Sequence, residues 1–284
     1  MPDSKFSLML KALRPKQWIK NLLVLAAPFA STKLLANFLT LVIALIGFIC
    51  ASIIGYLIND WQDRQRDRLH SIKKKRPFAS GELKLFDLVF LLLVSSFGVF
   101  ITCVIVGETL SQMLILYIGV SVSYTFLIKN IPVLEMFWLA FGFLVRAIAG
   151  SYILNETPTG WFVITIFFGS IFLTACKRLS EKESLSSQNS RMVLSSYPVS
   201  FLEAVSTIFA GLTAITYSLW VVQEHNSSYY AYFSILFFSC ALFSYLLTSF
   251  NTQAEEPESA LFKNRIVLSM GLATIFTLAW VFYS

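Results

Sequence analysis

The sequence has little charge for its length, and this scarcity indicates its class. Asp, Glu, Lys and Arg make up 13% of the 284 residues, whereas hydrophobic residues make up 56%. A soluble domain carries roughly 25% charged residues, so this chain has too few polar side chains to cover a surface that faces water. Lipid is the alternative solvent, and we therefore expect an integral membrane protein.

Histidine and cysteine are also scarce. The chain contains two histidines and four cysteines, and Cys50, Cys103, Cys176 and Cys240 stand singly in apolar stretches. Their spacing is that of neither metal ligands nor a disulfide framework, so we interpret them as small buried hydrophobic residues. The composition predicts no zinc site, and the sequence shows no convincing Ser-His-Asp or Cys-His set for nucleophilic catalysis.

Long apolar runs predict the membrane-spanning helices, since a bilayer core of about 30 Å needs about 20 apolar residues per helix. The runs cover about residues 17–31, 36–58, 85–106, 110–128, 133–153, 161–179, 200–222, 229–250 and 264–283. The first run is short and is interrupted by Lys20. No internal repeat and no strand-like alternation is visible. We therefore expect an all-α, polytopic membrane helical bundle of about nine transmembrane helices, with residues 1–284 forming a single domain.

The basic residues predict the orientation of this bundle. Of the 22 Lys and Arg residues, all except Lys33 and Arg146 fall in the N-terminal tail or at loops on the same side as the tail. The positive-inside rule then places the N-terminus in the cytoplasm and the C-terminus outside. We expect a multi-pass protein of the plasma (inner) membrane without a cleaved signal peptide. Its active-site loops, about residues 59–84 and 177–199, would face the cytoplasm.

An acidic run follows the second apolar run. If the helix continues beyond the membrane edge, Asn59, Asp63 and Asp67 lie on one face at i, i+4 and i+8. Tyr56 shares this face, and Asp60 lies beside it. Three carboxylates and an amide oxygen suit Mg²⁺, which takes one or two carboxylates together with water and substrate phosphate. The alternative is a solvated helix end whose acids pair with neighbouring arginines.

Basic residues at the predicted cytoplasmic membrane edges are candidates for binding substrate phosphates. They lie in the loop after the acidic run, at the end of the sixth apolar run and at two further edges: Lys73, Arg76, Lys177, Arg178, Lys20 and Lys129. The alternatives are contacts with anionic lipid and snorkelling of long side chains to the membrane surface.

Arg146 differs from the other basic residues because it lies within an apolar run. A charge at this depth costs about 2.5–3.5 kcal/mol on insertion scales and usually faces a cavity or a partner. A lipid headgroup or a buried acid would serve as that partner, and snorkelling past Gly150 is the alternative.

The run from Asn59 to Asp67 resembles the first aspartate-rich motif of the UbiA prenyltransferase superfamily. Within this superfamily, the chain is most similar to the decaprenyl-phosphate phosphoribosyltransferases. The matching stretches are residues 14–21, 56–77, 143–150 and 177–181, and the resemblance covers nearly the whole chain.

The resemblance implies a Mg²⁺-dependent transfer of 5-phosphoribose from phosphoribosyl diphosphate to a polyprenyl phosphate, with release of diphosphate. It implies Asn59 and Asp63 as Mg²⁺ ligands, and Asp60, Asp63 and Asp67 as candidate catalytic acids. The implied ligands of the donor's phosphates and ribose are Lys20, Tyr56, Lys73, Arg76 and Lys177, with Arg178 as a further substrate-binding candidate. Lys129 and Arg146 are candidates for the lipid phosphate. A membrane is an expected partner, nucleic acid is not, and the sequence is compatible with an oligomer.

Two departures from the superfamily pattern bear on the reaction. Prenyl-diphosphate users carry a second acidic motif after the sixth span, whereas here that place holds Lys177, Arg178 and Glu181. Positive charge at this place suits a donor with an additional 5-phosphate. Asn264 stands before Arg265 where an acid is common, which leaves the role of that loop open.

Two alternative functions remain. The first is transfer of a prenyl chain from a prenyl diphosphate to an aromatic acceptor. The second is a transporter or membrane scaffold, although transporters place polar features near the membrane midplane. The length of the polyprenyl chain and the downstream glycan stay open.

Overall fold

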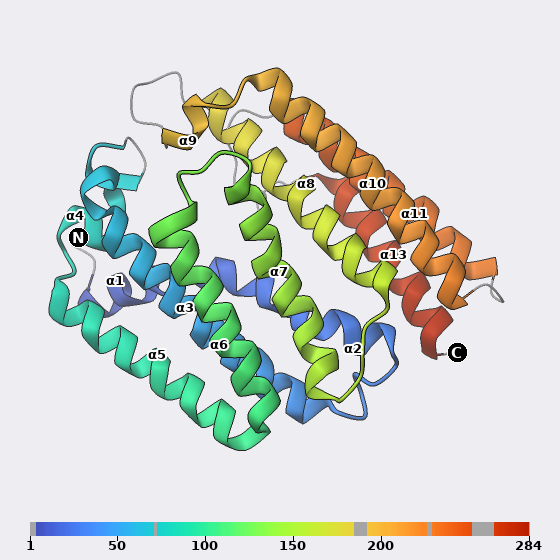
Figure 1. Ribbon diagram of the computed structural model, residues 1–284, viewed down its shortest axis with the longest axis horizontal. Coiled ribbons are helices and arrows are strands. Elements are labelled where there is room, and N and C mark those ends of the chain that lie inside the picture. The colour runs from blue at the N-terminus through green and yellow to red at the C-terminus, as the bar shows by residue number, and fades with distance from the viewer. Residues whose placement is uncertain (1–3, 71–72, 185–191, 226–228, 252–263, 284) are drawn as a thin grey trace. The chain divides into compact units, whose positions relative to one another are not determined.

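The computed structural model describes residues 4–70, 73–184, 192–225, 229–251 and 264–283 (Figure 1). These residues form helices and contain no strand. Residues 71–72 and 185–191, which belong to the two predicted active-site loops, lie outside the described residues. The chain forms two compact units: residues 1–28, 34–129 and 145–156 in the first, and residues 29–33, 130–144 and 157–284 in the second. The single domain expected from the sequence stays a prediction.

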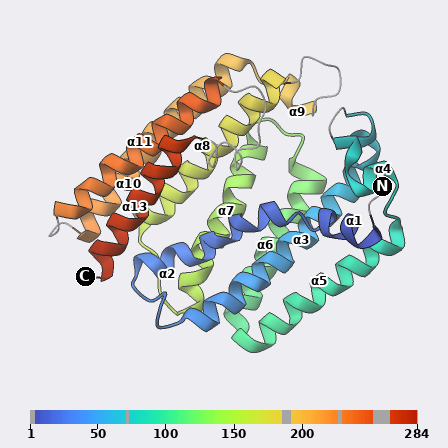
Figure 2. The same cartoon turned by 180° about the vertical axis from the view of Figure 1, so that it is seen from behind.

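The first unit is built around the long helix α3 (Phe38–Arg68). The other elements are α1 (Lys5–Ala12), η1 (Pro15–Leu25), α2 (Ala26–Ala30), whose last two residues belong to the second unit, η2 (Lys73–Lys75), α4 (Pro77–Ser80), α5 (Leu85–Val106), α6 (Glu108–Ser123) and the π-helical η3 (Tyr124–Ile128). Helix α3 packs against η1, α5 and α6 (Figure 2). An apolar cluster that includes Leu8, Leu57, Phe78 and Leu88 joins α1, α4 and α5 to α3. This packing holds α1 and α4, together with the residues next to them in the chain, against the end of α3.

The second unit contains the remaining helices. They are α7 (Leu134–Ile153), whose last residues belong to the first unit, α8 (Gly160–Ser184), α9 (Met192–Ser195), α10 (Val199–His225), α11 (Tyr229–Asn251) and α13 (Arg265–Tyr283). Helix α10 packs between α8 and α11, and α11 packs against α13 (Figure 1). Asn264 caps α13, because its Oδ1 accepts hydrogen bonds from the backbone of Ile266 at 2.9 Å and of Val267 at 3.3 Å. Asn264 thus has a structural role as a helix cap.

Eight helices within the described residues are long and apolar enough to cross a membrane. They cover Phe38–Arg68, Leu85–Val106, Glu108–Ile128, Leu134–Ile153, Gly160–Lys182, Val199–Glu224, Tyr229–Phe250 and Arg265–Tyr283. The all-α polytopic membrane fold is therefore confirmed, and the expected number of about nine is approximate.

The difference between about nine expected membrane-spanning helices and the eight of the described residues lies in the first apolar run, residues 17–31. These residues form the 3₁₀-helix η1 followed by the five-residue α2. Lys20 and Asn21 interrupt the apolar sequence, and Pro28 cannot donate a backbone hydrogen bond within a helix. A 3₁₀-helix rises about 2.0 Å per residue, so this segment is more extended than the α-helix expected from the sequence.

Candidate active site

The predicted acidic face exists on α3. This helix has 31 residues and is about 47 Å long, which leaves about 11 residues beyond a hydrocarbon core of about 30 Å. Asn59, Asp60, Asp63 and Asp67 all lie in its last three turns. The helix thus continues as far as the alignment of the acids requires, and the acids share one side of it.

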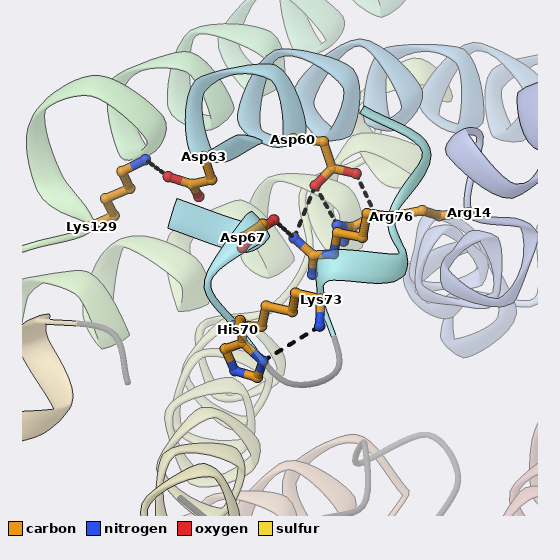
Figure 3. A network of polar contacts seen from close by, with 8 residues as sticks. All are labelled: Arg14, Asp60, Asp63, Asp67, His70, Lys73, Arg76 and Lys129. Atoms are coloured by element: carbon orange, nitrogen blue, oxygen red, sulfur yellow. Dashed lines mark hydrogen bonds and ion pairs between the residues drawn. The ribbon is translucent and has the colours of Figure 1, made fainter. Parts of the chain in front are cut away.

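Two of these acids bind arginines. Asp60 and Asp67 are each 4% exposed. The Arg14 guanidinium donates from Nε to Asp60 Oδ2 at 3.1 Å and from Nη2 to Asp60 Oδ1 at 2.5 Å. Arg76 Nη1 donates to Asp60 Oδ1 at 3.2 Å and to Asp67 Oδ2 at 2.7 Å (Figure 3). We call these four residues the arginine clamp. Its two acids and two bases balance, so Asp60 and Asp67 serve to hold Arg14 and Arg76 in this structure.

The backbone around Arg14 explains how its side chain reaches α3. Arg14 has φ 52° and ψ 61°, in the left-handed region, and Pro15 follows it as the first residue of η1. A non-glycine residue in this region is strained and persists only where its surroundings hold it. Two hydrogen bonds to Asp60 and the position of its guanidinium over the Tyr56 ring, 5.4 Å from the centroid, supply such support.

Asp63 has a different partner, Lys129. The Lys129 ammonium Nζ lies 2.6 Å from Asp63 Oδ1, and the side chains of Lys129 and Asp63 are 13% and 20% exposed (Figure 3). Lys129 directly follows the π-helical η3, and its backbone N–H donates to Tyr124 O at 3.0 Å. The structure thus brings together two predicted site residues that are 66 positions apart in the sequence.

The basic loop after α3 is tied to this end of the helix. The Lys73 backbone N–H donates to His70 Nδ1 at 3.4 Å, and His70 is 7% exposed (Figure 3). The Arg76 backbone N–H donates to Lys73 O at 2.9 Å, while Arg68 Nε donates to Ala79 O at 2.9 Å. His70 was not among the predicted site residues, and it fixes the start of the segment that carries Lys73 and Arg76.

The other predicted donor ligands of the first unit, Lys20 and Tyr56, are half-buried on η1 and α3. Asn59, one turn before Asp63, is also half-buried. Asn59 and Asp63 together offer hard oxygen donors with some access to solvent, and Mg²⁺ needs only one or two protein carboxylates. Within the described ranges, no group of three or more His, Cys, Asp or Glu is arranged as metal ligands. The donor set fits a single Mg²⁺ that takes its other ligands from water and substrate.

Arg146 on α7 lies in a separate buried polar cluster of the first unit. Its side chain is buried, so it does not snorkel to the surface. Arg146 Nε donates to Asn21 Oδ1 at 2.9 Å, and its Nη2 donates to the Tyr117 hydroxyl. Ser52 Oγ donates to the same Asn21 oxygen at 2.8 Å. These partners are neutral polar groups within the bundle, and the proposed contact of Arg146 with a lipid phosphate stays a prediction.

Arg178 occupies a buried ion-pair cluster in the second unit. It is 1% exposed and Glu135 is fully buried. Arg178 donates from Nε and Nη2 to the two Glu135 oxygens at 2.7 and 2.6 Å, and from Nη1 to Glu181 at 2.7 Å. Its guanidinium faces carboxylates, and the binding of substrate by Arg178 stays a prediction. Its neighbour Lys177 is half-buried.

Comparison with known proteins gives the family. Residues 21–268 match the UbiA prenyltransferase family. The chain belongs to this family.

Curated relatives and solved structures agree with the UbiA assignment. The chain is 32% identical to the decaprenyl-phosphate phosphoribosyltransferase of Mycolicibacterium smegmatis, over 99% of this chain and 94% of the relative. It is 30% identical to the protein of that name from Corynebacterium glutamicum, over 97% and 86%. A solved UbiA homologue from Archaeoglobus fulgidus, bound to GPP and Mg²⁺, superposes with a TM-score of 0.72 at 17% identity and covers 98% and 99% of the two chains. The protein is thus a multi-pass membrane transferase with the UbiA fold.

Proposed function

We propose that this UbiA-family enzyme transfers 5-phosphoribose from phosphoribosyl diphosphate to a polyprenyl phosphate. The names of the full-length relatives support this reaction. The observation that carries the proposal is the charge balance at the end of α3. Arg14 and Arg76 neutralise Asp60 and Asp67, so Asp63 is left as the acid of this face for a metal. One metal-binding acid surrounded by basic side chains suits a donor that is rich in phosphate.

The side chains have the following proposed roles. Asn59 and Asp63 hold Mg²⁺, which when bound neutralises charge on the diphosphate of the donor. Lys73 and Arg76, on the segment fixed by His70, orient donor phosphates. Further proposed ligands are Lys20 and Tyr56 for the donor, with Lys129 and Arg146 for the lipid phosphate; Lys177, in the second unit, stays a prediction from the sequence.

The chemistry needs positioning more than proton transfer. A phosphate ester is ionised at neutral pH and needs no protein base, which fits a site without a histidine-centred catalytic set. The residues must hold the nucleophile in line and stabilise the departing diphosphate. We expect an oxocarbenium-like transition state, inversion at the anomeric carbon and no covalent enzyme intermediate. A trapped phosphoribosyl-enzyme or a product of retained configuration would contradict this mechanism.

The proposed topology follows the distribution of basic residues. The N-terminus and the end of α3 lie at the cytoplasmic side of the inner membrane, with the C-terminus outside. Both proposed substrates would be bound at the cytoplasmic side.

Prenyl transfer from a prenyl diphosphate is the second candidate. The family and the solved homologues bound to GPP or DMAPP favour it. The end of α8 argues against it, because Glu181 is bound to Arg178 and no acidic motif follows there. Such enzymes use a second acidic motif to bind further metal, as the family resemblance implies.

The test is a transfer assay with purified protein, radiolabelled phosphoribosyl diphosphate, Mg²⁺ and a panel of polyprenyl phosphates. We expect Mg²⁺-dependent label in the organic phase, lost in Asp63→Asn. Glu82→Gln is the matched control, because Glu82 is an exposed acid whose side chain accepts a hydrogen bond from Ser80. No transfer to any lipid by folded protein would contradict the proposal and favour prenyl transfer.

A further inference from the structure

Lys129 forms an ion pair with the Asp63 carboxylate oxygen that a metal ion would bind. Its Nζ lies 2.6 Å from Asp63 Oδ1, and neither side chain is more than 20% exposed. The two charges are therefore partly withdrawn from water and neutralise each other. A divalent cation at Asp63 and the ammonium at the same oxygen would repel each other strongly at such separations.

The contrast with the arginine clamp shows which acid is able to exchange its partner. Arg14 engages both oxygens of Asp60 in a fork, and Arg76 spans Asp60 and Asp67. The planar, bidentate contact of Arg14 is pre-organised, and Arg76 Nη1 links the two acids. Lys129 is a point charge on a flexible four-carbon stem and contacts a single oxygen of Asp63. Of these acids, Asp63 has the partner that a metal would displace most readily.

The backbone of Lys129 is held while its side chain reaches across to α3. The Lys129 backbone N–H donates a hydrogen bond to Tyr124 O at 3.0 Å, which closes the π-turn. Within η3, Thr125 is buried, and its hydroxyl donates to Ser121 O at 3.0 Å. A Cβ placed on Gly55 would lie 3.1 Å from Ser121 Cβ, which shows how closely α6 approaches α3. Because the backbone of Lys129 is held and its side chain is flexible, the ammonium can move without any movement of the helices.

We propose that Lys129 and the divalent metal compete for Asp63, so that metal binding releases the Lys129 ammonium to an anionic group of the substrate. The inference rests on the proposed function in taking Asp63 as a metal ligand. Without metal, Lys129 balances the charge of Asp63. With metal bound, the freed ammonium becomes a ligand for a phosphate beside the metal. The metal then has to bind before the phosphate that Lys129 holds.

The first experiment measures metal affinity in the absence of any substrate. Mn²⁺ is titrated into detergent-solubilised full-length protein, and free Mn²⁺ is followed by electron paramagnetic resonance. Lys129→Met removes the competitor, and loss of a charge-assisted hydrogen bond predicts Mn²⁺ binding tighter by about tenfold. Lys129→Arg keeps the charge but offers Asp63 a bidentate fork, so this variant protein should bind Mn²⁺ more weakly than the unmodified protein.

The chain offers a matched control in Lys5→Met. Lys5 Nζ lies 2.6 Å from Asp87 Oδ1, the same separation as in the Lys129–Asp63 pair. This variant removes one positive charge from a lysine–aspartate ion pair outside the site, in which the Lys5 side chain is 63% exposed against 13% for Lys129. Its Mn²⁺ affinity should equal that of the unmodified protein, which separates competition at Asp63 from a general change in net charge.

The second experiment detects the released side chain. Lysines are acetylated with an N-hydroxysuccinimide ester at fixed pH, with and without Mn²⁺, and quantified by mass spectrometry. Labelling of Lys129 should rise when Mn²⁺ binds, whereas labelling of Lys5 should not change. In Asp63→Asn, labelling of Lys129 should be high from the start and insensitive to Mn²⁺.

The outcomes separate this exchange from the proposed reaction. Equal or weaker Mn²⁺ binding by Lys129→Met, or no saturable Mn²⁺ binding at all, would overturn the exchange. If the protein transfers phosphoribose but Lys129→Met leaves its Mn²⁺ affinity unchanged, only the proposed exchange is refuted and the proposed function stands. Tighter Mn²⁺ binding without phosphoribosyl transfer keeps the exchange and refutes the proposed function.

Discussion

Replacing Asp60 with asparagine removes a charge from the centre of the arginine clamp and nearly preserves the shape of the side chain. Asp60 is 4% exposed and accepts three hydrogen bonds, two from Arg14 and one from Arg76. An asparagine presents one oxygen and one NH₂ group, and the NH₂ group would face guanidinium donors. At least one hydrogen bond is therefore lost, and Arg14 loses the carboxylate with which it pairs.

The structure sets the magnitude. Removing one partner of a buried ion pair costs about 3–5 kcal/mol. The Arg14 and Arg76 side chains are 24% and 27% exposed, so water compensates part of this cost and we expect about 2–3 kcal/mol. At about 2 °C per kcal/mol for a chain of this size, the apparent Tm falls by about 5 °C. Asp63→Asn breaks a single charge-assisted contact with Lys129, and we expect about 1.5 kcal/mol or about 3 °C.

The assay compares the two variants by tryptophan fluorescence during heating and by Mn²⁺ titration. We expect Asp60→Asn to melt earlier than Asp63→Asn and to keep its Mn²⁺ affinity, whereas Asp63→Asn loses that affinity. The opposite pattern, with a stable Asp60→Asn that no longer binds Mn²⁺, would refute the division of the acids into clamp and metal ligand.

Two further predictions concern thermal stability. A Cβ on Gly150 would clash with the Val24 carbonyl oxygen, so Gly150→Ala should destabilise the protein by about 1–3 kcal/mol in thermal melts. Gly119→Ala, where a Cβ meets nothing within 4 Å, is its control and should melt no earlier than the unmodified protein. Glu135→Gln removes a fully buried partner of Arg178 and should cost about 3–5 kcal/mol. An unchanged Tm of that variant would contradict the buried ion pair.

The sequence predicts the helices and the acidic face well because both depend on local spacing. Apolar runs of the length of a bilayer predict eight of the helices, and the four-residue spacing of Asn59, Asp63 and Asp67 predicts their alignment once α3 extends to Arg68. Such patterns are properties of one helix and need no knowledge of its neighbours.

The partners of the acids could not be predicted in the same way. Arg14 lies 46 positions from Asp60, and Lys129 lies 66 positions from Asp63. Tertiary packing decides which of many basic residues meets which acid, and the sequence offers no local signal for it. A signal did exist for Glu135, because an acid at the start of a predicted span calls for a buried partner.

The π-helical winding of η3 determines whether Lys129 faces Asp63. One residue turns an α-helix by about 100°. Lys129 follows five residues wound with an i to i+5 hydrogen bond, from Lys129 N–H to Tyr124 O. If the same five residues were wound as an ordinary α-helix, the one residue that the π-turn absorbs would turn Lys129 by about 100° and away from Asp63. The chain would keep every charged side chain of the site and still leave Asp63 without its ammonium.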